Sequence, residues 1–453
     1  MEVGNKNPNS EPKLPPAQSV FCSSEVARSL LLLFLAAITG VAGALGIVFF
    51  RYLVDWCHEV FFSNLLPLIS FYAFGHNLGI ILLPVLGGLI IGPIMWRLAP
   101  ELVGHGVPET LEAFTYDGGR IRKRVAVLKV PVSAITLGSG GSAGREGPGA
   151  RIGAAVGSSI GELLQLRPDE VRLLLVAGLS AGITATFNAP LGGILFGIEI
   201  MYRKFRLPPL VILSIGLGCG ISAIVARLFI TKFTAFAPVE AEFGLVEMGY
   251  ASLLGLVFGF LSFLWVRCLY GIEHVFNQMK IVNDLKPAIG AIPVGVAGVF
   301  LLRYGVMGVG YEGIEAVLNA ELPVALLLGL FVTKLLVSGF TIGSGGSGGI
   351  FAPSLYMGAM AGFFLGHLAG PLLPTGPTII LIVGMASMFA GAARAPFTSA
   401  VLVAEVCGNY SLVLPLLIPS VVSFFVGSRL LNRASVYTLR VELKGKDIRP
   451  AVI

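Results

Sequence analysis

The stretch from Lys129 to Pro148 reads KVPVSAITLGSGGSAGREGP, and the stretch from Lys334 to Pro353 reads KLLVSGFTIGSGGSGGIFAP. At a constant offset of 205 residues, 11 of these 20 positions are identical, including the whole GSGGS segment and the closing proline. A second pair follows in the same order, because Asn188-Ala-Pro and Arg394-Ala-Pro lie 206 residues apart. Such self-similarity at a nearly fixed period indicates that the chain is a duplicated unit.

The two halves are predicted to span residues 29–230 and 245–430, and a weaker pair, Gly104-His-Gly and Gly308-Val-Gly, fits the same division. The basic residues Arg203, Lys204 and Arg206 follow soon after Glu199. After Glu405, its counterpart, no basic residue occurs before Arg429. Equivalent loops that differ in charge indicate opposite sides of a membrane, so we expect an inverted-topology repeat.

The composition predicts an all-α integral membrane protein. Of the 453 residues, 55% are hydrophobic and 12% are charged, and the mean hydropathy is +0.87. Soluble domains carry about 25% charged residues, so water cannot be the main solvent of this chain. We expect roughly ten or more spans or half-spans. The apolar runs include Leu30–Phe50, Leu78–Trp96, Leu207–Ile230, Ala251–Val266, Leu322–Val337, Leu355–Leu373, Ile379–Ala393 and Leu412–Val426.

The segments outside the two halves are short. Residues 1–28 are predicted to form a flexible cytoplasmic tail, and residues 431–453 a final pore-lining segment with a short cytoplasmic tail. Since only 13 residues follow Arg440, we expect no sizeable regulatory domain there. Basic clusters at Arg120–Arg124, at Arg203–Arg206 and after Arg440 mark candidate cytoplasmic loops, so the net charge of +6 indicates a positive-inside bias rather than nucleic-acid binding.

The scattered cysteines and histidines predict no metal site and no enzyme. The five cysteines are odd in number and lack CxxC spacing, so core thiols are the better interpretation. The five histidines lie far apart and form no HExxH motif. An intramembrane enzyme is therefore a less favoured alternative, and no cofactor is expected.

Each GSGGS loop is predicted to break a helix within the membrane. Glycine permits the unusual backbone angles of a break, and proline suits the first turn of the helix that follows. The second helical pieces are expected to begin near Arg145–Pro148 and Ile350–Pro353. A helix N-terminus at membrane depth presents free N–H groups and a partial positive charge, which form an anion site without a lysine. The alternatives are glycines that only allow tight helix crossings, or a phosphate loop, for which no GxxxxGK[ST] motif is present.

Glu146 stands in the first copy where the second copy has Phe351. An ionisable group at membrane depth is a candidate for function by default. Its carboxylate would occupy the place where the helix N-terminus favours an anion, and protonation would loosen its hold. We therefore interpret Glu146 as a gate. The alternative is a structural carboxylate that stabilises its own helix by about 0.3–1 kcal/mol.

These residues resemble the CLC family of chloride channels and proton/chloride exchangers, the voltage-gated chloride channel family. The resemblance spans nearly the whole transmembrane chain. The sequence shows no match to the paired C-terminal nucleotide-binding modules that many eukaryotic members carry. The matching motifs are Gly104-His-Gly-Val-Pro108, Gly144-Arg-Glu-Gly-Pro148, Phe187-Asn-Ala-Pro190, Gly193-Ile-Leu-Phe196, Gly349-Ile-Phe-Ala-Pro353 and Ser435-Val-Tyr437.

The resemblance implies a multi-pass homodimer of the cell membrane with both termini in the cytoplasm and chloride as the bound ion. Each subunit would hold one pore and consist of many tilted and broken helices in an inverted repeat. By motif match, the central anion would contact the backbone N–H groups of Ile350 and Phe351 and the hydroxyl of Tyr437. An outer site would use the backbone around Arg145, Glu146 and Gly147, with Glu146 as the gate. Protons and the lipid bilayer are the other expected partners.

One departure from the family pattern is His105, which replaces the serine of the usual GSGIP motif. A neutral imidazole can donate one hydrogen bond to an anion, and a protonated one adds charge and pH sensitivity. A histidine that turns away and leaves the backbone to serve the ion is equally compatible with the sequence. Selectivity among chloride, bromide, nitrate and fluoride therefore stays open.

The other departure is Ile200, which occupies the position of the inner proton-handling glutamate that family exchangers commonly carry. Glu199 lies about 100° around the helix from that position, so it is expected to make a structural contact instead. The sequence slightly favours proton/chloride exchange, because the short chain resembles bacterial members. A passive chloride channel is the alternative that Ile200 supports, and a fluoride-selective exchanger is less favoured because Tyr437 is present.

Overall fold

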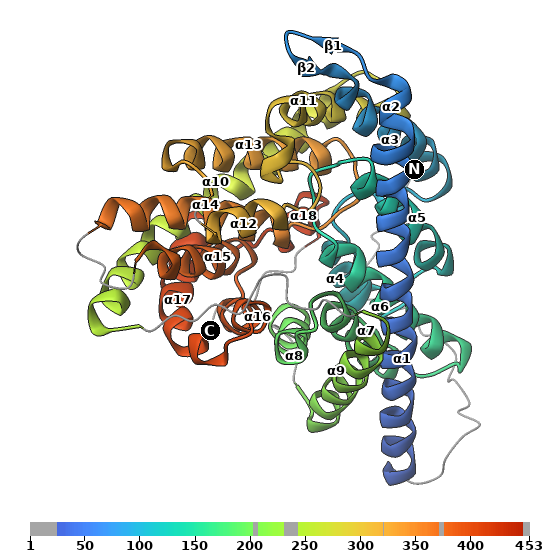
Figure 1. Cartoon of the computed structure of the whole chain (residues 1–453). Coiled ribbons are helices and arrows are strands. Elements are labelled where there is room, and N and C mark those ends of the chain that lie inside the picture. Colours follow the sequence, from blue (N-terminus) through green and yellow to red (C-terminus); the bar gives the residue numbers. More distant parts are fainter. Residues whose placement is uncertain (1–24, 203–206, 231–242, 320, 371–375, 447–453) are drawn as a thin grey trace, which may run out of the picture.

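The computed structural model describes residues 25–202, 207–230, 243–319, 321–370 and 376–446 (Figure 1). The part of the predicted tail before Glu25, the basic residues Arg203–Arg206 and Cys22 lie outside these described residues. The first helix already begins at Glu25, so it includes the last residues that were assigned to the tail. In the described part of the chain the only strands are β1 (Tyr72–Ala73) and β2 (His76–Asn77), which form one small antiparallel hairpin.

The first half of the chain consists of α1 to α9. In chain order these helices are α1 (Glu25–His58), α2 (Leu66–Ile69), α3 (Leu82–Pro93), α4 (Val107–Tyr116), α5 (Lys123–Gly138), α6 (Glu146–Leu163), α7 (Pro168–Phe187), α8 (Pro190–Phe196) and α9 (Pro209–Phe229). Three π-helical segments extend α1, α3 and α8, at Glu59–Leu65, Ile94–Leu98 and Gly197–Met201. Short 3-10 turns precede α3 and α4, at Leu78–Ile81 and Pro100–Leu102.

The second half consists of α10 to α17, and α18 follows it. These helices are α10 (Leu245–Gln278), α11 (Lys286–Leu301), α12 (Tyr311–Leu318), α13 (Val324–Gly343), α14 (Phe351–Ala369), α15 (Pro377–Ala393), α16 (Pro396–Val406), α17 (Val413–Leu430) and α18 (Thr438–Leu443). Figure 1 shows α1 and α5 to α9 on one side of the molecule and α13 to α17 on the other.

The described helices suit a membrane in length and composition. Eight helical stretches are long and apolar enough to cross a bilayer, and three shorter apolar helices accompany them. Their outward faces carry large exposed apolar side chains, for example Phe34 and Phe49 on α1 and Leu253 on α10. Such faces need a lipid environment, because soluble proteins seldom expose so much contiguous apolar surface.

Equivalent helix pairs cross closely at equivalent glycines. A Cβ atom on Gly153 of α6 would lie 2.0 Å from the carbonyl oxygen of Gly178 on α7, and the reverse distance is 2.1 Å. In the second half, Gly358 of α14 and Gly384 of α15 stand in the same relation, at 2.2 and 2.1 Å. Only glycine permits such an approach of two backbones, so the duplication extends from the sequence to the packing.

The helices α8 and α16 both begin at a proline, which suits the first turn of a helix because no N–H partner is needed there. Asn188 ends α7 and Arg394 ends α15, and both adopt left-handed backbone angles, with φ of 53° and 59°. In each half the next helix then starts two residues later, at Pro190 or Pro396. The repeated Ala-Pro motif is therefore a repeated helix-to-helix turn.

Candidate functional site

The two GSGGS loops meet in the interior of the molecule. Gly144 donates its amide hydrogen to the carbonyl oxygen of Gly349 at 2.8 Å, and Gly349 donates to Gly144 at 2.7 Å. The two glycines are equivalent in the repeat, and the segments pair in antiparallel orientation. Each loop also separates two helices as predicted, because α5 and α13 end before it and α6 and α14 begin after it.

Serine contacts around the loops are reciprocal. The hydroxyl groups of Ser133 and Ser347 lie 2.8 Å apart, and those of Ser142 and Ser338 lie 2.9 Å apart. Ser133 and Ser338 are equivalent in the repeat, as are Ser142 and Ser347. Each contact is therefore repeated with the roles of the halves exchanged, which is the signature of a local twofold relation between them.

Two buried lysines hold the backbone beside the loops. The Lys129 ammonium group donates to the carbonyl oxygens of Leu102 and Gly104, at 3.1 and 3.0 Å. Its counterpart Lys334 donates to the carbonyl oxygens of Gly305 and Gly308, at 3.0 and 3.1 Å. Charge-assisted bonds to carbonyl oxygens compensate the cost of burying these cations. The paired motifs at Gly104 and Gly308 are thus the segments that these lysines bind.

Glu146 breaks this symmetry. It is the first residue of α6 and is only 3% exposed, and its Oε1 accepts hydrogen bonds from the amides of Phe351 at 2.5 Å and Ala352 at 3.3 Å. The carboxylate also interacts with its own amide. The negative group therefore lies between the N-termini of α6 and α14, one from each half. Its Oε2 is buried and has no hydrogen-bond donor among the described residues.

The surroundings of the carboxylate are tightly packed. A Cβ atom on Gly147 would lie 2.2 Å from the carbonyl oxygen of His105 and 2.8 Å from the Cα atom of Gly349. The Phe351 ring is fully buried and packs edge-on against the rings of Phe187 and Phe389, with centroids 5.0 and 4.5 Å apart. Ile350 directly precedes α14 and is 1% exposed.

Tyr437, directly before α18, and His105, shortly before α4, lie side by side. The centroids of their rings are 5.7 Å apart, and both residues are buried. The Ser435 hydroxyl accepts hydrogen bonds from the amides of Tyr437 and Thr438, at 3.2 and 3.1 Å, which fixes the turn before α18. The His105 Nε2 lies 3.3 Å from the hydroxyl of Tyr270, so this nitrogen faces α10.

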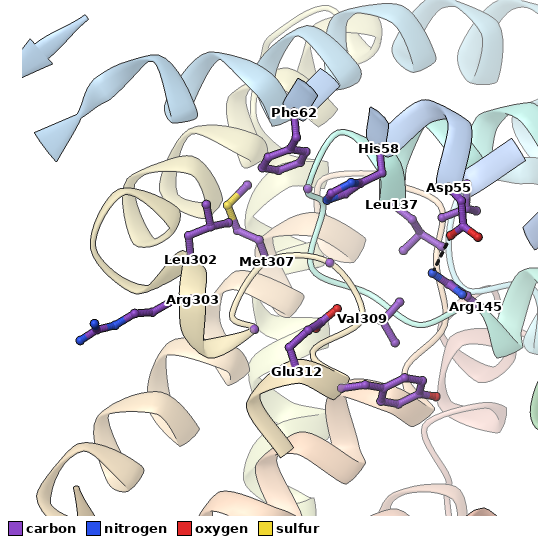
Figure 2. Close-up of a pocket in the computed structure, with 15 residues that line it drawn as sticks. Asp55, His58, Phe62, Leu137, Arg145, Leu302, Arg303, Met307, Val309 and Glu312 are labelled. Atoms are coloured by element: carbon purple, nitrogen blue, oxygen red, sulfur yellow. Dashed lines mark hydrogen bonds and ion pairs between the residues drawn. The ribbon is translucent and has the colours of Figure 1, made fainter. Parts of the chain in front are cut away.

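A cavity of about 510 Å³ opens beside the residue that precedes Glu146 (Figure 2). Its walls come from the end of α1, from the first GSGGS loop and from residues 302–312. Figure 2 shows the Arg145 guanidinium directed into the cavity, where it pairs with the Asp55 carboxylate at 3.3 Å. Arg303 and Glu312 also line the cavity, so its charges are mixed. The cavity reaches Arg145, whereas Glu146 is not among its lining residues.

Comparison with known proteins identifies the family to which this chain belongs. Residues 87–428 match the protein family described as "Voltage gated chloride channel". The chain belongs to this family. The "H(+)/Cl(-) exchange transporter ClcA" of Yersinia pestis is 31% identical over 450 residues, which cover 94% of this chain and 90% of the relative. The protein of the same name from Vibrio vulnificus is 33% identical, with coverages of 88% and 86%.

Solved structures of the family share the fold. The "X-ray crystal structure of a slow cyanobacterial Cl-/H+ antiporter" matches with a TM-score of 0.80 and 26% identity, and covers 92% of this chain and 98% of the other. A "CLC-type fluoride/proton antiporter" matches with a TM-score of 0.77 at 21% identity and coverages of 92% and 99%, which is a likeness of fold alone. This chain is thus a multi-pass, all-helical membrane protein with the CLC fold.

The structure shows which groups the Glu199 side chain contacts. Its carboxylate accepts hydrogen bonds from the amides of Phe397 at 3.3 Å and Thr398 at 2.8 Å, so it caps α16. Glu405 does the same for α8, through the amides of Leu191 and Gly192. The predicted structural contact is confirmed. Ile200 is 7% exposed and lies within the π-helical segment that extends α8.

Some residues of the site were not predicted from the sequence. Ala352 donates to Glu146 although no role was predicted for it within its motif, and Tyr270 contacts His105 although it belongs to no motif. Ala352 was within reach of sequence reasoning, because it is the next amide of the predicted helix start at Ile350–Pro353. Tyr270 was not, because it lies 165 residues from His105 in an apolar helix without a motif.

Proposed function

We propose that this protein exchanges chloride for protons across a cell membrane, with Glu146 as the gate. The observation that carries the proposal is the position of the Glu146 carboxylate between two helix N-termini. It accepts the amide hydrogens of Phe351 and Ala352, which an anion would otherwise accept. The carboxylate is therefore a covalently attached competitor of the transported anion.

This competition links proton occupancy to anion passage. An ionised Glu146 holds the amides and excludes a chloride ion. A protonated Glu146 carries no charge, so its bonds to the amides weaken and the helix N-termini become free to bind chloride. The amides bind a monovalent anion without a full opposite charge at the site, which keeps binding weak enough for release. The central ligands remain those predicted by motif: the amides of Ile350 and Phe351 and the hydroxyl of Tyr437.

The relatives support exchange rather than passive conduction. The Yersinia and Vibrio proteins and the cyanobacterial protein carry exchanger or antiporter names at 26–33% identity. Ile200 favours the second candidate, a passive chloride channel, because an apolar side chain at this position cannot carry a proton. An exchanger with Ile200 needs another route for the proton on that side of Glu146.

The assembly is proposed to be a homodimer with one pore in each subunit and with both termini in the cytoplasm. The exposed apolar residues of α9 and α17, such as Leu213, Leu228 and Phe425, provide a surface for lipid or for a second copy. Cross-linking in native membranes should trap a dimer. A mass that corresponds to one chain in a lipid nanodisc would contradict the dimer.

Flux measurements in liposomes test the proposed function. An outward chloride gradient should drive protons inward against their own gradient in the wild-type protein. At a chloride concentration that saturates the anion site, Glu146→Gln should abolish the proton movement and make chloride flux independent of pH between about 4.5 and about 7.5, a range that starts near the usual pKa of glutamate. Glu321→Gln, at an exposed glutamate, is the matched control and should behave like the wild type.

The result separates the two candidate functions. Chloride flux without any chloride-driven proton movement in the wild type would identify a passive channel. Chloride flux that keeps its pH dependence in Glu146→Gln at saturating chloride would remove Glu146 from the gate.

A further inference from the structure

The hydrogen bonds around His105 define which ring nitrogen carries the proton in the neutral form. Tyr270 has a single hydroxyl hydrogen, and it donates this hydrogen to the carbonyl oxygen of Val436. The Tyr270 oxygen can therefore only accept from the imidazole Nε2 at 3.3 Å. A neutral imidazole has one N–H group, so that group is Nε2–H. Nδ1 is then a bare lone pair.

The bare nitrogen is buried and has no hydrogen-bond donor among the described residues. His105 as a whole is 1% exposed. A lone pair repels a nearby anion, so the neutral histidine cannot replace the donor hydroxyl of the serine that family members usually carry at this position. Only the protonated imidazole offers an Nδ1–H group as a donor.

His105 also lies beside the predicted anion path. Its carbonyl oxygen packs against Gly147, the residue after Glu146, and its ring packs against Tyr437. A protonated imidazole is costly to bury alone, but a chloride ion at hydrogen-bond distance from Nδ1 supplies the missing charge. Proton and anion therefore favour each other at this position.

The charged groups around the ring come from three elements. Burial of the ring lowers the pKa of His105 most, Glu109 on α4 raises it, and Arg440 on α18 and Lys129 on α5 lower it further. Glu109 and Arg440 pair with each other at 3.0 Å, so their effects on the ring largely cancel. The remaining Lys129 is bonded to carbonyl oxygens, including that of Gly104. The occupancy of the anion site then decides the protonation of His105.

We propose that His105 is a second proton-binding site of this protein, which takes up a proton on Nδ1 together with the chloride ion that it helps to bind. The proton comes from solution, adds to the Nδ1 lone pair and leaves when the anion leaves. This proposal rests on the proposed function, because it requires chloride to pass beside His105. His105 would then supply a proton acceptor in a chain that has Ile200 in place of the inner glutamate.

Calorimetry of chloride binding tests the proposal. Purified full-length protein with Glu146→Gln is titrated with potassium chloride in two buffers of different ionisation enthalpy, which reports the protons taken up per chloride bound. We expect uptake of up to about one proton, and an affinity that rises by up to about tenfold for each unit of pH decrease, as linkage requires. Adding His105→Asn, which keeps a polar side chain that cannot be protonated, should abolish both effects.

Tyr270→Phe provides a test in which the histidine is kept. Without the tyrosine oxygen, Nε2–H loses its acceptor, and the neutral ring is free to carry its hydrogen on Nδ1. Chloride can then bind without an added proton, so we expect proton uptake to fall in the Glu146→Gln background. Tyr250→Phe is the matched control, because it removes another hydroxyl from α10 that bonds the carbonyl oxygen of Leu365. It should leave proton uptake unchanged.

The outcomes separate this proposal from the proposed function. Proton uptake that persists in Glu146→Gln/His105→Asn, or is absent from Glu146→Gln alone, would overturn the role of His105. Proton uptake on chloride binding in Glu146→Gln, together with a wild-type protein that moves no protons in liposomes, would overturn exchange and leave His105 as a proton-dependent anion ligand of a channel.

Discussion

Glu146 and Phe351 occupy equivalent positions in the two halves of the repeat, and several contacts around them are reciprocal between the halves. The serine pairs, the loop glycines and the buried lysines all occur twice, once from each half. A carboxylate stands at only one of the two positions, so the proposed gate occurs once and not twice. The packing around this carboxylate then determines how far it can move.

Gly144→Ala is predicted to open the gate without removing the carboxylate. A Cβ atom on Gly144 would lie 1.9 and 2.2 Å from the two carboxylate oxygens of Glu146, which is far inside van der Waals contact. The movable carboxylate must yield, and it then loses the amides of Phe351 and Ala352. Chloride flux measured near neutral pH should rise several-fold and depend less on pH.

The control for this prediction is the combination of Gly144→Ala with Glu146→Gln. If the methyl group acts through the carboxylate, the double variant should have the flux of Glu146→Gln alone. A flux below that of the wild type in Gly144→Ala, with an intact fold, would show that the loop itself is obstructed.

Among the secondary-structure elements, two helix starts are each capped by a glutamate from the other half of the chain. Glu199 caps α16 and Glu405 caps α8, so each half stabilises a helix start of the other. Glu199→Gln keeps an acceptor oxygen but loses the charge at the helix N-terminus, which should cost about 0.3–1 kcal/mol of stability. Because Glu199 caps a helix, we expect it not to relay protons, so the ratio of protons to chloride ions in liposomes should stay unchanged. Loss of proton coupling in Glu199→Gln would contradict the assignment.

The glycine crossings give a second prediction about elements. Gly153→Ala places a methyl group 2.0 Å from the carbonyl oxygen of Gly178, and Gly358→Ala does the same against Gly384. Each variant should lose roughly 1–3 kcal/mol of stability, as overpacking typically costs. Thermal unfolding in detergent measures the loss. Gly329→Ala, in an exposed part of α13 with open space around it, should not lower the midpoint.

For the whole molecule, the sequence was sufficient to predict the membrane class, the duplication, the broken helices and the position of Glu146 at a helix start, whereas its role as a gate stays a prediction. These features follow from local patterns: hydropathy, a repeated GSGGS segment, and one glutamate in place of a phenylalanine. The reciprocal contacts between the halves depend on tertiary packing and could not be predicted. Glu146 was expected at its own helix N-terminus, whereas the structure shows that it also binds the first amides of α14.

The orientation of His105 shows the same limit at long range. The sequence left two possibilities, a ligand of the anion or a residue turned away. The structure directs Nε2 to Tyr270 and leaves Nδ1 buried without a donor among the described residues, and no local pattern encodes this choice. The contact depends on how α10 packs against the segment before α4, and therefore on the whole fold.

The central claim is that the Glu146 carboxylate occupies the place of a transported anion. Diffraction from crystals of Glu146→Gln grown in bromide tests it most directly, because bromide gives an anomalous signal. The claim predicts a bromide peak at hydrogen-bond distance from the amides of Phe351 and Ala352 in the variant, and no peak there in the wild type at the same bromide concentration. A peak at these amides in both proteins, or in neither, would contradict it.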